Sequence, residues 1–244
     1  MAEISSQVIS SIGSLTDEFK TIAHNLANVS TAGYKRRVGS FASIFEQQDM
    51  QQQSEEQQVG ELVTELDFSQ GNLFETDRNL DLALHGKGFF VIETPEGPLY
   101  TRNGVFHINQ NSQLVDSEGR IVAGQAGAIS VPNNITDSQL SVSTDGTIRA
   151  GEATIGKFRL VDFGENENKL ESAGLNCFYM PVKEIEPVAA SSVVVKQGFL
   201  ESSNVQIIHE LVNMIMVSRL YEANMKLIST SGDATKSLLS AAMG

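Results

Sequence analysis

Apolar residues recur at alternating intervals of four and three near both ends of the chain, whereas the middle consists of short apolar runs separated by turns. Ser, Gln, Asp, Glu, Lys and other polar residues fill most of the positions between the apolar ones in the N-terminal stripe. The members of this stripe are Val8, Ile12, Leu15, Phe19, Ile22 and Leu26. A heptad seam of this kind predicts an amphipathic helix over about residues 4–28.

A second stripe predicts a C-terminal helix over about residues 204–241. It consists of Ile207, Leu211, Met214, Ser218, Tyr221, Met225 and Ile228. Ile208, Val212 and Ile215 widen it, and a helix that is apolar on more than one face needs more than one neighbour. Two interpretations remain open at this point: the helices pair within one chain, or they pack against copies of the same chain.

From about Gly71 the sequence is typical of β-structure, with turn signals every ~8–12 residues that favour a small barrel or sandwich. Asn103-Gly104 predicts a hairpin turn, and residues 154–163 alternate well enough for an edge strand. Hairpins are expected from residues 88–93 with 99–101, from 114–115 with 121–123 and from 140–142 with 147–149, and further strands at residues 105–108 and 193–195. The fold class is therefore α+β: a coiled-coil-like pair of terminal helices, a central β-rich domain and an extended arm.

The same pattern divides the chain into four expected segments. Residues 1–34 form the N-terminal core helix and turn, residues 35–70 the extended arm or linker, residues 71–200 the β-rich outer domain, and residues 201–244 the C-terminal core helix. In the arm, residues 46–58 are polar and rich in glutamine. After the first helix, Ser30 to Gly33 predict a turn in which Gly33 takes a positive φ. Residues 201–204 offer caps for the last helix.

Charge is distributed unevenly. The net charge is −13, and residues 46–200 alone carry ten Lys/Arg against 23 Asp/Glu. Near-neutral ends suit the close packing of many helices, because stacked like charges would repel. An acidic middle suits a solvated surface and argues against nucleic acid as a partner, since nucleic acid needs a basic stripe.

Composition sets further bounds. No stretch approaches the ~18 apolar residues that a membrane span needs. The first residues lack the pattern of a cleaved signal peptide, which suggests a cytoplasmic protein or export by another route. The single cysteine, Cys177, lies in an apolar run and is expected to be an inert core thiol.

Catalytic motifs are missing, so we expect no enzyme, no cofactor, no metal and no small-molecule substrate. The chain has no Gly-x-Ser-x-Gly elbow and no phosphate loop. His209-Glu210 begins like a zinc-protease helix, but Asn213 stands where the second histidine would be. Asp116 and Asp145 sit in hairpin turns, where carboxylates serve the turn itself.

Three motifs in order along the chain resemble the flagellar rod and hook proteins. The first is residues 25–35 (NLANVSTAGYK), and the second is residues 80–90 (LDLALHGKGFF) with 100–104 (YTRNG). The third is residues 197–205 (QGFLESSNV) with 211–215 (LVNMI) and 221–224 (YEAN). The motif residues singled out are Asn25, Leu26, Asn28, Gly33, Tyr34, Asn204, Asn213, Glu222 and Asn224. Together these matches bracket nearly the whole chain.

The resemblance implies a structural subunit of the bacterial flagellar basal-body rod that polymerises helically through its terminal helices around an axial channel and transmits torque. It also implies export by the flagellar type III apparatus without a cleavable signal, location in the periplasm-spanning rod, and other rod and hook proteins as partners. The helix ends would order on assembly. Candidates for channel lining are Gln7, Ser11, Ser14, Asn213, Asn224 and Ser231.

Within the family, the chain length and the single modest β-domain favour a rod protein over the longer hook proteins. The short middle favours the proximal-rod type, whereas the glutamine-rich segment could be the extended loop of the distal-rod type. Another hook-basal-body axial protein, or a soluble binding or cap module with a closed helical hairpin, is the alternative.

Overall fold

The computed structural model describes residues 2–39, 64–132, 135–182 and 184–243, which form two compact units. The helical unit consists of the described parts of residues 1–27, 37–65 and 206–244, and the β-rich unit of those of residues 28–36 and 66–205. Much of the predicted arm, including the glutamine-rich residues 46–58, lies outside the described residues. The four predicted segment boundaries therefore stay predictions.

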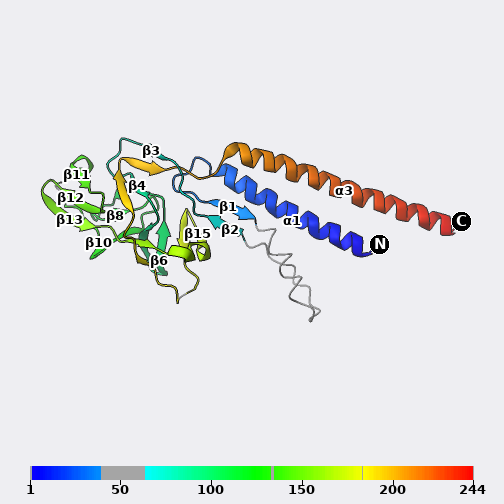
Figure 1. Ribbon diagram of the computed structural model, residues 1–244, viewed down its shortest axis with the longest axis horizontal. Helices are drawn as coiled ribbons and strands as arrows, with labels where there is room; N and C mark the ends of the chain where they lie inside the picture. The colour runs from blue at the N-terminus through cyan, green and yellow to red at the C-terminus, as the bar shows by residue number, and fades with distance from the viewer. Residues whose placement is uncertain (1, 40–63, 133–134, 183, 244) are drawn as a thin grey trace. The chain divides into compact units, whose positions relative to one another are not determined.

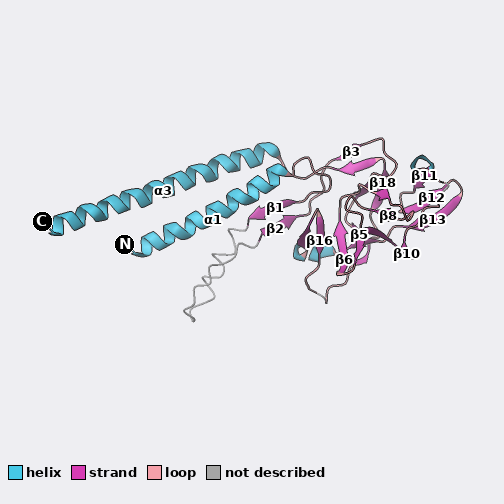
Figure 2. Ribbon diagram, turned by 180° about the vertical axis from the view of Figure 1, so that it is seen from behind, coloured by secondary structure: helices cyan, strands magenta, loops and turns pink. Residues whose placement is uncertain are grey.

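Two long helices make up most of the helical unit and run side by side (Figures 1 and 2). Helix α1 spans Ala2–Ala27 and α3 spans Ile207–Met243. Leu15 and Ile22 of α1 are buried against Val217 of α3, and Met214 packs on the same cluster. The predicted pairing of the terminal helices within an α+β fold is confirmed.

Nineteen short strands occur in the described residues. The first ten are β1 Arg36–Gly39, β2 Thr64–Asp67, β3 Leu73–Glu75, β4 Leu82–His85, β5 Phe89–Thr94, β6 Gly97–Thr101, β7 His107–Ile108, β8 Leu114–Val115, β9 Ile121–Gly124 and β10 Gly127–Ala128. The others are β11 Leu140–Val142, β12 Thr147–Ala150, β13 Ala153–Lys157, β14 Leu160–Asp162, β15 Glu171–Gly174, β16 Cys177–Tyr179, β17 Val188–Ala189, β18 Val194–Gln197 and β19 Phe199–Glu201. The described connections also include two 3-10 helices, Asp137–Gln139 and Gly164–Lys169.

The largest sheet runs in the order β15-β16-β6-β5-β9-β8-β7, with β10, β14 and β17 paired beside this path. Its centre, β5, is buried on both faces, because side chains alternate across a strand. Phe90 and Ile92 belong to one hydrophobic cluster, and Phe89 and Val91 to a second. The two-sided core explains why residues 89–92 form a continuous apolar run instead of an alternating one.

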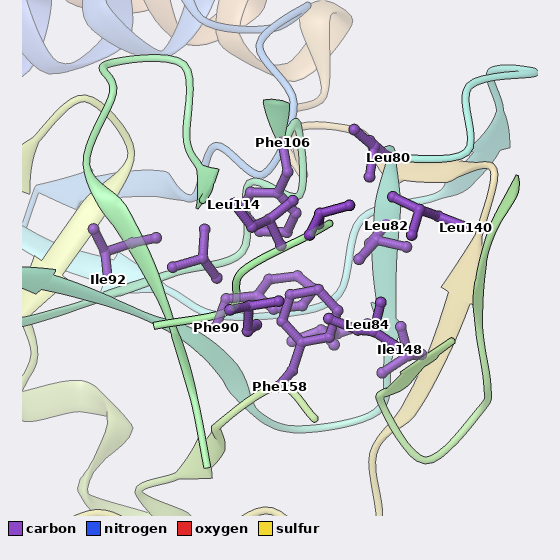
Figure 3. Packing of buried hydrophobic residues seen from close by; sticks show 14 of the residues in the cluster. Leu80, Leu82, Leu84, Phe90, Ile92, Phe106, Leu114, Leu140, Ile148 and Phe158 are labelled. Atoms are coloured by element: carbon purple, nitrogen blue, oxygen red, sulfur yellow. The ribbon is translucent and has the colours of Figure 1, made fainter. Parts of the chain in front are cut away.

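The larger cluster joins this sheet to β4, β11, β12 and β18 (Figure 3). Phe90, Phe106 and Phe158 form its aromatic centre, with ring centroids 5.0 to 5.9 Å apart. Leu82 and Leu84 extend into it from β4, which pairs with β18 from late in the sequence. The β-rich unit is thereby held together by segments far apart in the chain.

Most hairpin predictions are confirmed, including β5–β6, β8–β9 and β11–β12. The predicted hairpin turn at Asn103-Gly104 is wrong. The chain there continues alongside β4, where Gly104 O accepts a hydrogen bond from Leu82 N. A Cβ on Gly104 would lie 1.6 Å from Leu82 O, so glycine serves a close approach and not a turn. The single edge strand predicted over residues 154–163 is two strands, β13 and β14, separated by the buried Phe158.

Candidate functional site

Three chain segments meet inside the β-rich unit at residues 33–36, 67–72 and 199–205. Gly33 N donates to Glu201 O at 2.8 Å, and Ser202 N donates to Asn72 O at 2.8 Å. Strands β3 and β19 pair antiparallel beside these bonds. The first and the third of the sequence motifs are therefore in direct contact, and the contact is made by backbone groups as well as side chains.

A buried ion pair lies at the centre of this junction. Lys35 Nζ is 2.7 Å from Glu201 Oε1, and the two side chains are 1% and 0% exposed. Lys35 Nζ also donates to Ser69 O at 2.7 Å, while Glu201 Oε1 accepts from Gly71 N at 2.9 Å. A buried charge needs a partner and further hydrogen bonds to offset its lost hydration, and both ions have them here.

Arg102, from the second motif, adds a second cation to the pair. Its Nη1 lies 3.5 Å from Glu201 Oε2 and donates to Gly86 O at 2.8 Å, and its guanidinium stacks over the Phe89 ring with 5.1 Å to the centroid. Lys35, Arg102 and Glu201, here called the junction cluster, thus bring all three motifs to one point. Two buried cations share the single carboxylate of Glu201.

Electrostatics follow from this burial. Loss of hydration lowers the pKa of the Lys35 ammonium below its ordinary value, and the Glu201 carboxylate opposes that shift. Burial likewise lowers the pKa of the Arg102 guanidinium, against the opposing effects of Glu201, Glu167 and Asp162. Glu201 is therefore the group that makes burial of both cations tolerable.

Gly33 adopts the positive φ that the sequence predicts, at +68°. A Cβ there would lie 2.4 Å from Asn103 N and 2.6 Å from Arg102 C. Both the backbone conformation and the close approach of another chain segment require glycine. The turn at the end of α1 is thus fitted against the second motif.

Asn204 ties the junction together instead of capping α3 as predicted. Its Oδ1 accepts from Arg36 N at 2.7 Å, and its Nδ2 donates to Asp67 O at 2.7 Å and to Ser69 O at 3.1 Å. One side-chain amide therefore bridges two other segments. The reason is that an asparagine amide offers an acceptor and two donors in one plane, which a serine cap does not.

Asn25 performs a similar task within the helical unit. It is fully buried in α1, where its Nδ2 donates to Arg37 O at 2.8 Å and its Oδ1 accepts from Arg37 N at 2.9 Å. The amide imitates one strand-like backbone pairing and holds the start of β1 beside the helix. The remaining N-terminal motif residues are placed as follows: Tyr34 is buried, and Leu26 and Asn28 are half-buried.

Only part of the predicted packing set comes together in the single chain. Leu15, Ile22 and Met214 meet at Val217, which the predicted seam omitted in favour of Ser218. Val217, three residues after Met214, is the residue that faces α1, whereas Ser218, four residues after it, is exposed. Half-buried members are Val8, Ile12 and Leu26, and exposed members are Phe19, Ile207, Leu211, Tyr221, Met225 and Ile228.

The polar residues that the sequence singles out on the two helices have different surroundings in the structure. Asn224 Nδ2 donates to Ser11 Oγ at 3.1 Å, which links α3 to α1. Ser14 Oγ donates to the Ser10 carbonyl of its own helix. Asn213 is half-buried and Glu222 is exposed. The side chains of Gln7 and Ser231 lie outside the described part of the structure.

The two turn carboxylates have structural partners. Asp116 accepts from the backbone N–H groups of Glu118 and Arg120, and Asp145 accepts from Thr147 and Lys157. Arg120 also donates to the Sγ of the buried Cys177 at 3.1 Å. Among the residues with described positions, no group of three or more His, Cys, Asp or Glu could hold a metal ion. No helix in this part of the chain is long and apolar enough to cross a membrane.

Comparison with known proteins agrees with the location of the three motifs. Residues 83–150 match the family model described as the flagellar hook protein FlgE/F/G D1 domain, and residues 196–241 match that of the flagellar basal body rod FlgEFG protein C-terminal region. A flagellar basal-body rod protein FlgG of Buchnera aphidicola (strain Bp) is 37% identical over 242 residues, which cover 89% of this chain and 91% of the relative.

Two further relatives support the same assignment. A FlgF of Mesorhizobium japonicum is 32% identical over 89% of this chain and 90% of its own, and a FlgG of Bacillus subtilis is 28% identical over 95% and 96%. The chain belongs to the flagellar basal-body rod protein family. It is a structural protein of the flagellar rod and not an enzyme.

Sequence reasoning did not identify the junction cluster. Lys35, Arg102 and Glu201 lie inside the three motifs, yet each reads as an ordinary surface charge, and Glu201 was expected near a helix cap. The available signal was that a charged residue stands in each of the three motifs. Only the fold shows that these charges face one another.

Proposed function

We propose that the chain polymerises through α1 and α3, with copies packing helix against helix around an axial channel so that the rod transmits torque. The observation that supports this most is the apolar surface that α1 leaves uncovered on α3. Its exposed members are Ile207, Ile208, Leu211, Val212, Ile215, Met216, Leu220, Tyr221, Met225, Leu227 and Ile228. So many exposed large apolar side chains on one helix indicate a protein contact.

The predicted packing residues divide into two functions under this proposal. Leu15, Ile22 and Met214 hold α1 and α3 together within a chain, whereas Leu211, Tyr221 and Ile228 contact other copies. Copies related by a rotation and a translation form an open helical assembly instead of a closed ring. Partners would be further rod and hook proteins, with delivery by the flagellar type III export apparatus. Ordering of the helix ends on assembly stays a prediction.

Substitution of one exposed residue tests the assembly proposal. Leu211→Asp places a charge on the apolar surface, so we expect rods to be absent and motility lost while the circular dichroism of the purified chain is unchanged. Ser229→Asp, at an exposed polar position of the same helix, is the matched control and should assemble. Normal rods with Leu211→Asp would favour the closed binding-module alternative.

The rod type is a second part of the proposal. The preference for the proximal type is not confirmed, and we propose the distal type. FlgG, the distal-rod type, is the name of relatives that are 34% and 37% identical to this chain. A peptide tag in the exposed turn at Gln125-Ala126, labelled with gold in purified hook-basal bodies, should decorate the hook end of the rod. Label at the inner-membrane end would restore the proximal type.

A further inference from the structure

We infer that residues 194–205, here called the C-terminal strap, dock last when the β-rich unit folds. The strap contains β18, β19 and the segment that follows them as far as Val205. It supplies Glu201 and Asn204 to the junction and the buried side chains of Val195, Leu200 and Val205. It follows that the β-rich unit closes only when nearly the whole chain is present.

The pairing of the strap is entirely long-range. Val194 pairs with His85 and Glu201 with Leu73, so the strand partners of β18 and β19 lie 109 to 128 residues earlier in the sequence. By contrast, β5 and β6 are joined by a tight turn, as are β11 and β12. Closing a long loop costs more conformational entropy than closing a short one, and non-local contacts therefore form later. β18 and β19 need β4 and β3 as pairing partners, so the strap can be stabilised only after it has docked against them.

Charge makes the same order necessary at the N-terminal side of the junction. Without Glu201, Lys35 and Arg102 would be buried without the carboxylate that both of them contact. The backbone N–H groups of Gly33 and Arg36 also donate hydrogen bonds to the strap, Gly33 N to the Glu201 backbone O and Arg36 N to the Asn204 side-chain Oδ1. Residues 33–36 and the strap therefore become ordered in one step, although they lie at opposite ends of the β-rich sequence.

This order delays folding while the chain is being made. Synthesis proceeds from the N-terminus, so a growing chain can form β5–β6 and the other local hairpins long before Glu201 exists. Until then Lys35 and Arg102 remain in water and the junction stays open. A single chain folds in this order whether or not it assembles into a rod.

Pulse-labelled hydrogen exchange during refolding of the full-length chain tests the order. Amides that bond across the β5–β6 hairpin should gain protection in an early phase. Val195, Gly198 and Ser202, whose amides bond to Thr144, Asp81 and Asn72, should gain it in a later phase together with Gly33 and Arg36. Protection of the strap in the same phase as β5–β6, or of residues 33–36 well before the strap, would overturn the inference.

A variant links the late phase to the charge. Glu201→Gln should slow the late phase at least tenfold and leave the early phase unchanged, because the two cations then lose the carboxylate that contacts both of them. Glu75→Gln makes the same chemical change at an exposed site on β3, the partner strand of β19, and should alter neither phase. An unchanged late phase in Glu201→Gln would contradict the role of the charge. If Glu201→Gln does not fold, the labelling of the unsubstituted chain decides the order alone.

Discussion

Lys35 Nζ and Glu201 Oε1 lie 2.7 Å apart in the interior of the β-rich unit although 166 residues separate them in sequence. One residue follows the end of α1 and the other precedes the start of α3. Inside the β-rich unit, the pair therefore joins the segment that follows α1 in sequence to the segment that precedes α3. Arg102 joins from the centre of the sequence, so three distant motifs serve one contact.

Removal of the carboxylate should destabilise the fold strongly. Glu201→Gln removes the carboxylate that contacts both buried cations, Lys35 and Arg102, and we expect the free energy of unfolding of the full-length chain to fall by ~3–5 kcal/mol. Urea denaturation followed by circular dichroism measures the change. Lys20→Ala, which removes the exposed pair of Lys20 with Asp17, is the control and should change stability by less than ~0.5 kcal/mol.

Coupling between the two residues gives a second reading of the same contact. Lys35→Met should lower the free energy of unfolding by less in the Glu201→Gln variant than in the original chain, because the variant has already lost the ion pair. If the losses of unfolding free energy from the two substitutions simply add, the two side chains act independently, contrary to the 2.7 Å distance between Lys35 Nζ and Glu201 Oε1.

Substitution of Gly33 should damage the turn after α1. Gly33→Val forces a β-branched residue to a φ of +68° and into the backbone of Asn103, so we expect a loss of at least ~2 kcal/mol in denaturant unfolding. Gly13→Ala is the matched comparison: it lies within α1 with no atom within 4 Å of the added Cβ, and should stabilise by ~0.5–1 kcal/mol. Equal effects of both changes would show that the turn does not need glycine.

Cys177 should be unreactive in the folded protein. Burial raises the pKa of its thiol above the usual value, and Arg120 opposes this only in part. Because the folded pKa is raised, the stability gained from the neutral thiol is present below the unfolded pKa and is lost as pH rises through the folded pKa. We expect iodoacetamide at pH 8 to modify the native chain about a hundredfold more slowly than the chain in urea. Equal rates would show that the thiol is accessible.

Periodicity was sufficient to predict the elements that local sequence determines. The heptad seam predicted α1 and its pairing with α3, turn residues predicted the β5–β6 and β11–β12 hairpins, and the Ser30–Gly33 turn predicted the φ of Gly33. Each of these depends on residues close together in the chain, for which side-chain spacing and backbone preferences decide the outcome.

The failures share a different cause. Asn103-Gly104 has the composition of a turn, but β4 approaches the chain so closely there that glycine is needed in an extended segment. Asn204 has the composition of a cap, but the segments at Arg36 and Asp67 compete for its amide. Burial of Lys35 depends on Glu201, which no local pattern relates to it. Tertiary contacts decide these positions, and one sequence does not reveal them.

Hydroxyl-radical footprinting tests most directly whether the exposed apolar surface of α3 becomes buried between copies in the rod. Met216 on that surface is 57% exposed in the single chain, whereas Met180 in the β-rich unit is half-buried and provides the internal reference. Oxidation follows exposure, so we expect the rate at Met216 to fall roughly tenfold between the purified monomer and isolated basal bodies, with little change at Met180. An unchanged rate at Met216 would show that α3 faces solvent in the rod and would contradict assembly through the terminal helices.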